Sequence, residues 1–171
     1  MLITLAALWA GCAWSGHDGA RLLPADRSAA VTYVALVDST VEGVGASSPR
    51  LNYVSLVHAR LRAVYPNARV TNLGVGGATS AHVLLRQLDR GIELSPHLVT
   101  LSIGPNDITT AVPVTSYERN LETVFGRLGS VTTTVVVANL IPDLTVTPRF
   151  SRSRKRDAVA TLTVRFTPRH M

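Results

Sequence analysis

The most constraining feature of this sequence is an alternation of β-branched apolar runs with stretches of helical periodicity. Four runs predict strands, because they are short, apolar and bounded by turn-forming residues. They are residues 31–36, 69–73, 97–103 and 132–138. The fourth run is continuously β-branched, which is typical of a strand covered on both faces.

Between and after these runs, apolar residues recur at the three-to-four spacing of a helix with one buried face. Ser47, Ser48 and Pro49 predict a helix start, with Val54, Val57, Leu61 and Val64 inward. A second helix from about Ser80 turns Val83, Leu84 and Leu88 inward. Thr115 and Glu118 form a capping-box pattern before Leu121, Val124, Phe125 and Leu128. The last predicted helix spans Arg154 to Phe166.

Alternating strands and helices with short connections predict a parallel sheet with helices on both faces, a three-layer α/β/α sandwich. In such sheets, ligands bind at the carboxyl ends of the strands. The first three strands each lead into a glycine-bearing turn. We therefore expect these turns to meet at one edge of the sheet.

Length and charge limit the classes of protein to which this chain can belong. A chain of 171 residues suits one domain that buries roughly 70% of its unfolded surface. The net charge is +6, but from Arg149 onward seven basic side chains face one acidic, whereas residues 1–148 hold ten of each. The basicity belongs to the last helix and tail, so we expect no nucleic-acid partner.

The first 16 residues, MLITLAALWAGCAWSG, are apolar up to the single cysteine, Cys12. They resemble a bacterial lipoprotein signal, in which lipidation of Cys12 would anchor the chain in the cell envelope, although Trp9 replaces the usual leucine and no basic residue precedes the run. A misplaced start codon or a packed segment in a cytoplasmic protein are the alternatives. About ten apolar residues are too few to span a membrane. We expect residues 17–29 to be a linker and residues 30–171 the domain.

Three short motifs carry the chemistry that we can assign. The first strand ends in ALVDSTVEGVG, with Ser39 and Gly43; the second leads into NLGVGGATS, with Gly77; the third leads into LSIGPNDI, with Asn106. Each motif alone has an ordinary structural interpretation, since Asp38-Ser39 suits a helix cap and Asn106-Asp107 a turn. The glycines at 74, 76 and 77 lack the spacing of a dinucleotide-binding loop.

Together, in this order, the three motifs resemble the sequence blocks of the SGNH, or GDSL-type, hydrolases. The resemblance implies a flavodoxin-like SGNH hydrolase fold and an esterase or lipase-like activity without a cofactor or metal. It makes Ser39 the nucleophile, and Gly77 and Asn106 the oxyanion donors. Val37 departs from the family pattern, because a glycine is usual at that position.

These residue types fit that chemistry independently of the family. A serine hydroxyl attacks an ester when a base takes its proton, and the tetrahedral intermediate then carries negative charge on the former carbonyl oxygen. Preorganised N–H donors, such as the Gly77 backbone and the Asn106 amide, stabilise that charge. We expect Glu42 and Asp107 to satisfy local donors and not to act as acids.

The general base is the missing part. The family's Asp-x-x-His block has no match among His17, His58, His82, His97 and His170. His170 is the candidate that remains, although Thr167, not an aspartate, stands three residues before it. We therefore expect a chain truncated before its last strand and helix, with impaired hydrolysis.

The sequence thus predicts a GDSL-type hydrolase of acyl, acetyl or thioester bonds in small-molecule, lipid or carbohydrate substrates. Two alternatives stay open: a non-catalytic remnant that binds a ligand in the same cleft, and an exported envelope protein whose partner completes the site. Without a fifth strand, the fourth strand would form an exposed edge, so we also expect self-association.

Overall fold

The computed structural model describes residues 22–38, 51–131, 134–138 and 141–166. Its centre is a parallel sheet of four strands in the order β2-β1-β3-β4. The strands are β1 (Thr32–Val37), β2 (Arg69–Asn72), β3 (Leu98–Ser102) and β4 (Val135–Ala138). All four were predicted from their apolar runs, with ends that differ by a few residues.

The register aligns the strand ends on which the site depends. Ala35 of β1 pairs with Asn72, the last residue of β2. Val37 pairs with Ser102, the last residue of β3. Because the strands are parallel, the turns after β1, β2 and β3 leave the sheet at the same edge, as expected for this class of fold.

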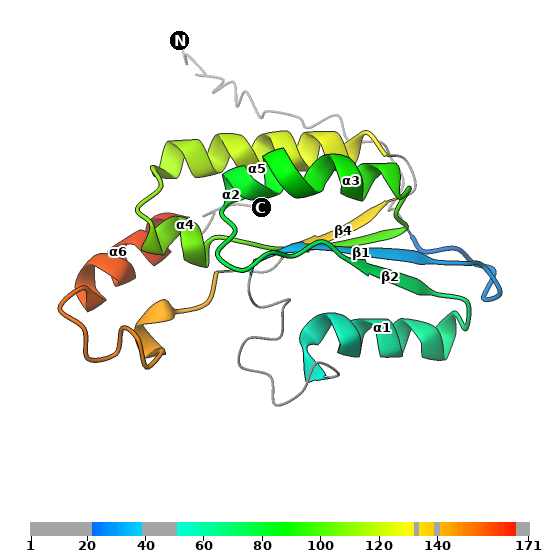
Figure 1. The fold of residues 1–171 in the computed structure, drawn as a ribbon, viewed down its shortest axis with the longest axis horizontal. Coiled ribbons are helices and arrows are strands. Elements are labelled where there is room, and N and C mark those ends of the chain that lie inside the picture. Colours follow the sequence, from blue (N-terminus) through cyan, green and yellow to red (C-terminus); the bar gives the residue numbers. More distant parts are fainter. Residues whose placement is uncertain (1–21, 39–50, 132–133, 139–140, 167–171) are drawn as a thin grey trace, which may run out of the picture.

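Helices cover both faces of the sheet (Figure 1). One face packs against α1 (Tyr53–Val64). The other face is covered by α5 (Val114–Gly129) and by a continuous helical run of α2 (Ser80–His82), η2 (Val83–Gln87) and α3 (Leu88–Glu93). This arrangement confirms the predicted three-layer α/β/α architecture.

The remaining elements lie beyond the carboxyl ends of the strands (Figure 1). They are α4 (Pro105–Thr109), η3 (Leu144–Val146) and α6 (Arg156–Phe166). Phe166 is buried and its ring lies 4.7 Å from that of Tyr117 on α5. The C-terminal helix therefore closes this end of the larger core, and its bounds agree with the predicted ones to within two residues.

The larger core lies between the sheet and the α3 and α5 layer. Val34 and Leu36 of β1 and Val99 and Leu101 of β3 are almost fully buried there, together with Leu88 of α3. The smaller core, under α1, centres on Tyr33, Ala35, Val54 and Leu98. Alternate residues of β1 and β3 thus serve opposite faces, as the period of a strand requires.

The turn between β3 and α4 has a glycine, Gly104, with a positive φ angle. Its φ angle is +120°, and a Cβ built there would lie 2.6 Å from the Cδ1 atom of Ile141. Both the conformation and the close approach require glycine at this position. Pro105 then begins α4 with its fixed φ, where the missing N–H has no cost. This turn carries Asn106 and Asp107 to the edge of the sheet.

The start of α1 differs from the prediction. The helix begins at Tyr53 and not near Ser47, which lies outside the described residues, and Asn52 caps it by accepting a hydrogen bond from the Ser55 backbone at 2.8 Å. Val64, predicted to face inward, is 44% exposed. The next residue, Tyr65, takes the buried place instead and packs against Val31.

Two other predictions were wrong. The capping box at Thr115 and Glu118 does not form, because the N-cap of α5 is Pro113, two residues before Thr115, and no side chain caps the helix. In β4, the predicted burial on both faces fails at Val137, which is 52% exposed. Ala138 is exposed as well, so the outer end of β4 lacks a full cover among the described residues.

The described part of the predicted linker, residues 22–29, contacts the domain. Leu23 packs against the smaller core under α1 and against a neighbouring cluster of Val31, Tyr65 and Ala68. The Tyr65 hydroxyl donates to the carbonyl oxygen of Pro24 at 2.8 Å, and the Arg27 guanidinium lies over the Tyr65 ring. These contacts place residues 23–27 on the surface of the domain.

Candidate active site

The carboxyl end of β1 leads to Asp38, whose side chain is almost fully buried. Ser39, the predicted nucleophile, lies outside the described residues, as do Glu42 and Gly43. The position of Asp38 nevertheless locates the point at which the chain enters that segment. Asp38 directly follows Val37, the register partner of Ser102.

The turn after β2 presents the backbone of Gly77. Its φ angle is +78°, a left-handed conformation that favours glycine, and a Cβ placed there would meet no atom within 4 Å. Gly77 is exposed. Within the described ranges, no group accepts a hydrogen bond from its N–H. The turn therefore holds a backbone donor that has no hydrogen-bond acceptor among the described residues, as an oxyanion donor must.

Asn106, on the first turn of α4, joins the three strand ends. Its Nδ2 atom donates to the carbonyl oxygen of Ala78 at 2.9 Å and approaches the Oδ2 atom of Asp38 at 3.5 Å. The first distance is a normal hydrogen bond and the second is at the limit of one. The structure thus brings Asn106 beside the residue after Gly77 and the residue before Ser39.

Asp107 is fully buried and accepts hydrogen bonds from Ser80 of α2. Its two carboxylate oxygens lie 3.1 and 3.0 Å from the Ser80 backbone nitrogen, and the Ser80 hydroxyl donates at 2.6 Å. Burial raises the pKa of Asp107 above its ordinary value, the Ser80 hydrogen bonds oppose this shift, and the charge of Asp38 adds to it. As predicted, Asp107 satisfies loop donors.

The three histidines of the described segments each form a hydrogen bond with another described residue. His58 bonds the carbonyl oxygen of Ala68, and His82 pairs with the hydroxyl of Thr79 at 2.9 Å. His97 accepts from the backbone of Thr32 at the opposite edge of the sheet. None of the three forms a hydrogen bond with Asp38 or Asn106. His17, His170 and Cys12 lie outside the described residues.

Two further classes of site were searched for in the same ranges. No group of three or more His, Cys, Asp or Glu side chains in the described part could hold a metal ion. No helix there has the length and apolar character needed to cross a bilayer.

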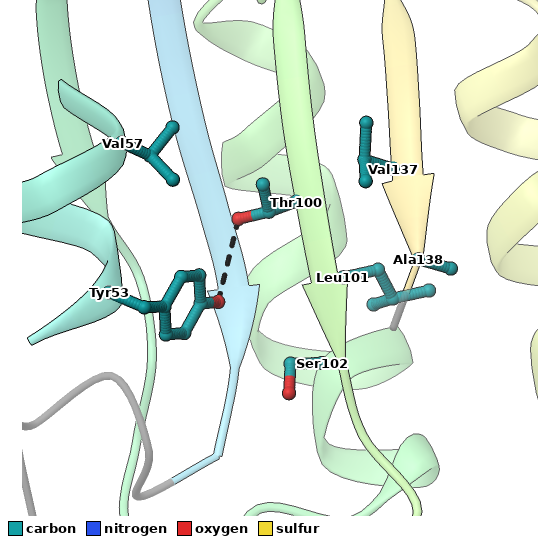
Figure 2. Close-up of a pocket in the computed structure, with 7 residues that line it drawn as sticks. All are labelled: Tyr53, Val57, Thr100, Leu101, Ser102, Val137 and Ala138. Atoms are coloured by element: carbon teal, nitrogen blue, oxygen red, sulfur yellow. Dashed lines mark hydrogen bonds between the residues drawn. The ribbon is translucent and has the colours of Figure 1, made fainter. Parts of the chain in front are cut away.

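A groove of about 430 Å³ opens on the α1 side of the sheet, over the outer halves of β3 and β4 (Figure 2). Its wall is apolar except for three hydroxyl groups. The lining residues are Tyr53, Val57, Thr100, Leu101, Ser102, Val137 and Ala138.

The Tyr53 hydroxyl lies 3.5 Å from the Thr100 hydroxyl, which also bonds Tyr33 at 2.9 Å. Burial raises the pKa of Tyr53 to about 12, and the charge of Asp38 adds to that shift.

Sequence reasoning missed Ser80 and Asn120. The Asn120 side chain, on α5, donates to the Ser80 hydroxyl at 2.9 Å. Ser80 was predicted only as the start of a helix. No local pattern connects the three residues, because Ser80 lies 40 positions from Asn120 and 27 positions from Asp107 along the chain.

Comparison with known proteins agrees with this geometry. Residues 38–167 match the GDSL-like Lipase/Acylhydrolase family. Among curated proteins, no sequence matches the chain.

Three solved structures illustrate the likeness in fold. A protein of the G-D-S-L family from Desulfitobacterium hafniense is 15% identical, with a TM-score of 0.62, over 80% of this chain and 67% of that one. TesA is 24% identical, with a TM-score of 0.57, over 78% and 74%. The acetyl xylan esterase AlAXEase is 15% identical, with a TM-score of 0.58, over 80% and 72%.

At these identities, the solved structures establish the fold. The family match establishes the membership of a family, since it spans most of the chain and includes Asp38, Gly77 and Asn106. The four-stranded parallel sheet with helices on both faces is the arrangement expected of such hydrolases. The chain belongs to the GDSL-like Lipase/Acylhydrolase family.

Proposed function

We propose that this chain is a serine hydrolase that cleaves ester bonds through an acyl-Ser39 intermediate. The observation that carries the proposal is the position of Asn106, whose amide lies between Ala78 and Asp38. A substrate carbonyl beside Ser39 would then lie near the Gly77 N–H and the second hydrogen of the Asn106 amide. Two such donors would stabilise the negative charge of the tetrahedral intermediate.

We propose further that the chain by itself turns over slowly. The described histidines are tied to other partners, and the sequence has no Asp-x-x-His block. Without a base, loss of the serine proton is the difficult step, and removal of a triad histidine costs on the order of a millionfold in turnover. His170 stays the candidate base within this sequence.

The lack of a histidine at the described site favours a second candidate function, which is ligand binding without catalysis. The same donors that stabilise an oxyanion would bind a carboxylate or carbonyl group of an acyl or carbohydrate ligand. A partner that supplies the base is the third alternative. These three functions share one cleft and differ only in the base.

The experiment compares nitrophenyl acetate hydrolysis by three proteins: the chain as given, the chain extended by a family-like Asp-x-x-His segment, and the extended chain with Ser39→Ala. We expect activity near background for the chain as given and restored activity for the extended chain. The extended chain with Ser39→Ala should return to background. Failure of the extended chain would remove support for catalysis unless Val37→Gly restores it. Normal turnover by the original chain that is lost on His170→Ala would identify His170 as the base.

For the substrate, we propose esters of small molecules, lipids or carbohydrates, since the proteins of similar fold include an acetyl xylan esterase. Cofactors have no part in this mechanism. The division into a segment 1–16, a linker 17–29 and a domain from residue 30 remains our proposal, and so does membrane anchoring through Cys12. Mass spectrometry of the chain made in a bacterial host would test whether Cys12 carries lipid.

We also propose that the chain associates with itself through β4. The support is the exposed end of that strand at Val137, next to the apolar groove. Exposed apolar strand edges offer backbone donors and acceptors to a second chain.

A further inference from the structure

Ser80 and Asp107 form a buried polar pair between the turn after β2 and the helix after β3. Both side chains are fully buried. Asp107 forms no salt bridge within the described residues, so its carboxylate depends on hydrogen bonds. Ser80 donates three of these, two from its backbone nitrogen and one from its hydroxyl. A buried carboxylate held in this way resists displacement, because each broken bond leaves a buried polar atom unsatisfied.

Asn120 extends this pair to the outer helix layer. Its Nδ2 atom, on α5, donates to the Ser80 hydroxyl at 2.9 Å. That hydroxyl has one proton and gives it to Asp107 at 2.6 Å. Since Asn120 occupies an acceptor site of the hydroxyl, the proton stays directed toward the carboxylate. The chain of bonds runs in one direction, from Asn120 through Ser80 to Asp107.

The network holds the turn that carries the two donors. Asp107 bonds Ser80, and the adjacent Asn106 bonds the carbonyl oxygen of Ala78. Two consecutive side chains of α4 therefore form hydrogen bonds with the residues on both sides of Thr79. These residues, Ala78 and Ser80, closely follow Gly77. The distance between the Gly77 N–H and the Asn106 amide depends on this double attachment.

We propose that Asn120 is a positioning residue for the Gly77 and Asn106 donors and acts through Ser80 and Asp107. The proposal rests on the proposed function, in which these two groups bind the oxyanion. Displacements of about 1 Å far from the reacting atoms can cost on the order of a hundredfold in rate. A small rotation of α2 against α4 would change the direction of the Gly77 N–H without unfolding the domain.

The test uses a probe that binds at equilibrium and needs no turnover. Phenylboronic acid adds to a serine oxygen while the serine proton passes to the buffer, which gives a negatively charged tetrahedral boronate, and one of its B–OH oxygens occupies the oxyanion position. Its dissociation constant for the whole chain can be measured by calorimetry. We expect Asn120→Ala to weaken binding about tenfold, roughly a tenth of the effect that loss of an entire oxyanion donor has on turnover. Ser80→Ala should weaken binding at least as much.

Two control variants separate positioning from general stability. Glu122→Ala changes an exposed residue of the same helix, and Val124→Ala removes buried methyl groups without touching the network. We expect Val124→Ala to lower the unfolding temperature at least as much as Asn120→Ala and to leave boronate affinity within twofold. Equal losses of affinity in Val124→Ala and Asn120→Ala would overturn the proposal, and so would unchanged affinity in Asn120→Ala.

A second readout distinguishes failure of this inference from failure of the proposed function. If the chain does not bind phenylboronic acid, or binds it equally after Ser39→Ala, then Ser39 forms no boronate adduct and the affinity does not report on the two donors. Nuclear magnetic resonance then decides the positioning role. Asn120→Ala should shift the Gly77 amide and the Asn106 side-chain amide signals and speed hydrogen exchange at Ser80 about tenfold. Signals and exchange that match those of Glu122→Ala would overturn it.

Discussion

Asn106 donates its side-chain amide to the carbonyl oxygen of Ala78 at 2.9 Å, which ties the first turn of α4 to the turn after β2. The amide has a second hydrogen, and the nearest described acceptor for it, Asp38, is 3.5 Å away. A bond that long is weak. A substrate oxygen can therefore compete for that hydrogen without breaking the bond that orients the side chain.

Replacement of Asn106 by alanine should lower the turnover of the histidine-extended chain by about 10²–10³-fold, the usual cost of one oxyanion donor. Stability should fall by about 1 kcal/mol, since the Ala78 carbonyl loses its partner. The measurements are steady-state kinetics and urea unfolding. Asn106→Asp is the matched control, because it keeps the size of the side chain and removes the donors. Turnover within threefold of the parent in either variant would contradict the assignment.

Gly77→Ala should destabilise the protein by about 1 kcal/mol, the cost of a left-handed conformation for a residue with a Cβ. The reason is the φ angle of +78°, since the position has open space around it. Gly126 on α5 also has open space, but its φ angle is not positive. Gly126→Ala should therefore stabilise the helix by up to about 1 kcal/mol. Thermal unfolding of the pair measures both effects; the same sign in both would refute the explanation.

Gly104→Ala should cost more than Gly77→Ala, because strain and a collision act together. The φ angle is +120° and the new methyl group would approach Ile141 to 2.6 Å. Adding Ile141→Ala to this variant should remove the collision and leave the strain. In a double-mutant cycle measured by urea unfolding, Gly104→Ala should therefore cost less stability in the Ile141→Ala background than in the parent chain. Strictly additive losses would mean that no collision occurs.

The pH dependence of stability should carry a contribution from Asp107. Burial raises its pKa in the folded protein above the ordinary value of 3.8. The folded state then holds this proton more tightly than the unfolded state does. The contribution is fully present below about pH 3.8 and is lost as the pH rises through the folded pKa.

Asp107→Asn keeps an acceptor for Ser80 and removes this titration. Relative to that variant, the parent chain should lose stability between pH 4 and the folded pKa, in unfolding experiments at several pH values. The opposite trend, a parent that gains on the variant as the pH rises, would mean that the Ser80 hydrogen bonds outweigh burial. Thr123→Ala, an exposed change on α5, provides the reference for unspecific effects of pH.

Val137→Lys should raise the fraction of monomer at high concentration, because a charge on an exposed strand end opposes pairing of edges. Val137 is 52% exposed on β4. Val146 of η3 is 73% exposed and lies outside the sheet, so Val146→Lys is the matched control. Light scattering after size-exclusion chromatography measures both. A parent chain that is monomeric at high concentration would contradict self-association.

The sequence predicted the sheet because each strand is an apolar run between residues that favour turns. It also predicted which turns meet, since parallel strands end at the same edge. The burial of β4 was not predictable, because β-branched residues indicate a strand but not what lies over it. Val137 has the same residue type as the buried Val99 and a different environment.

Helix starts were predicted less well, because several residues compete for the cap. Ser47 and Thr115 both suit an N-cap, yet Asn52 and Pro113 hold those positions. The contacts of Ser80 were not predictable at all. Its partners Asp107 and Asn120 contact it only through the tertiary fold, and no spacing within the sequence predicts these contacts.

Between α2 and α3 the helix passes through η2, whose wider π-turn holds one residue more than an α-turn does. One residue of an α-helix corresponds to a rotation of about 100°. The extra residue thus sets how far α3 is rotated about the helix axis relative to α2. With this rotation, Ser80 faces Asp107 while Gly91 faces Leu36 of β1. Deletion of the exposed Leu85 would give a more regular helix and would turn one of these two ends away from its partner.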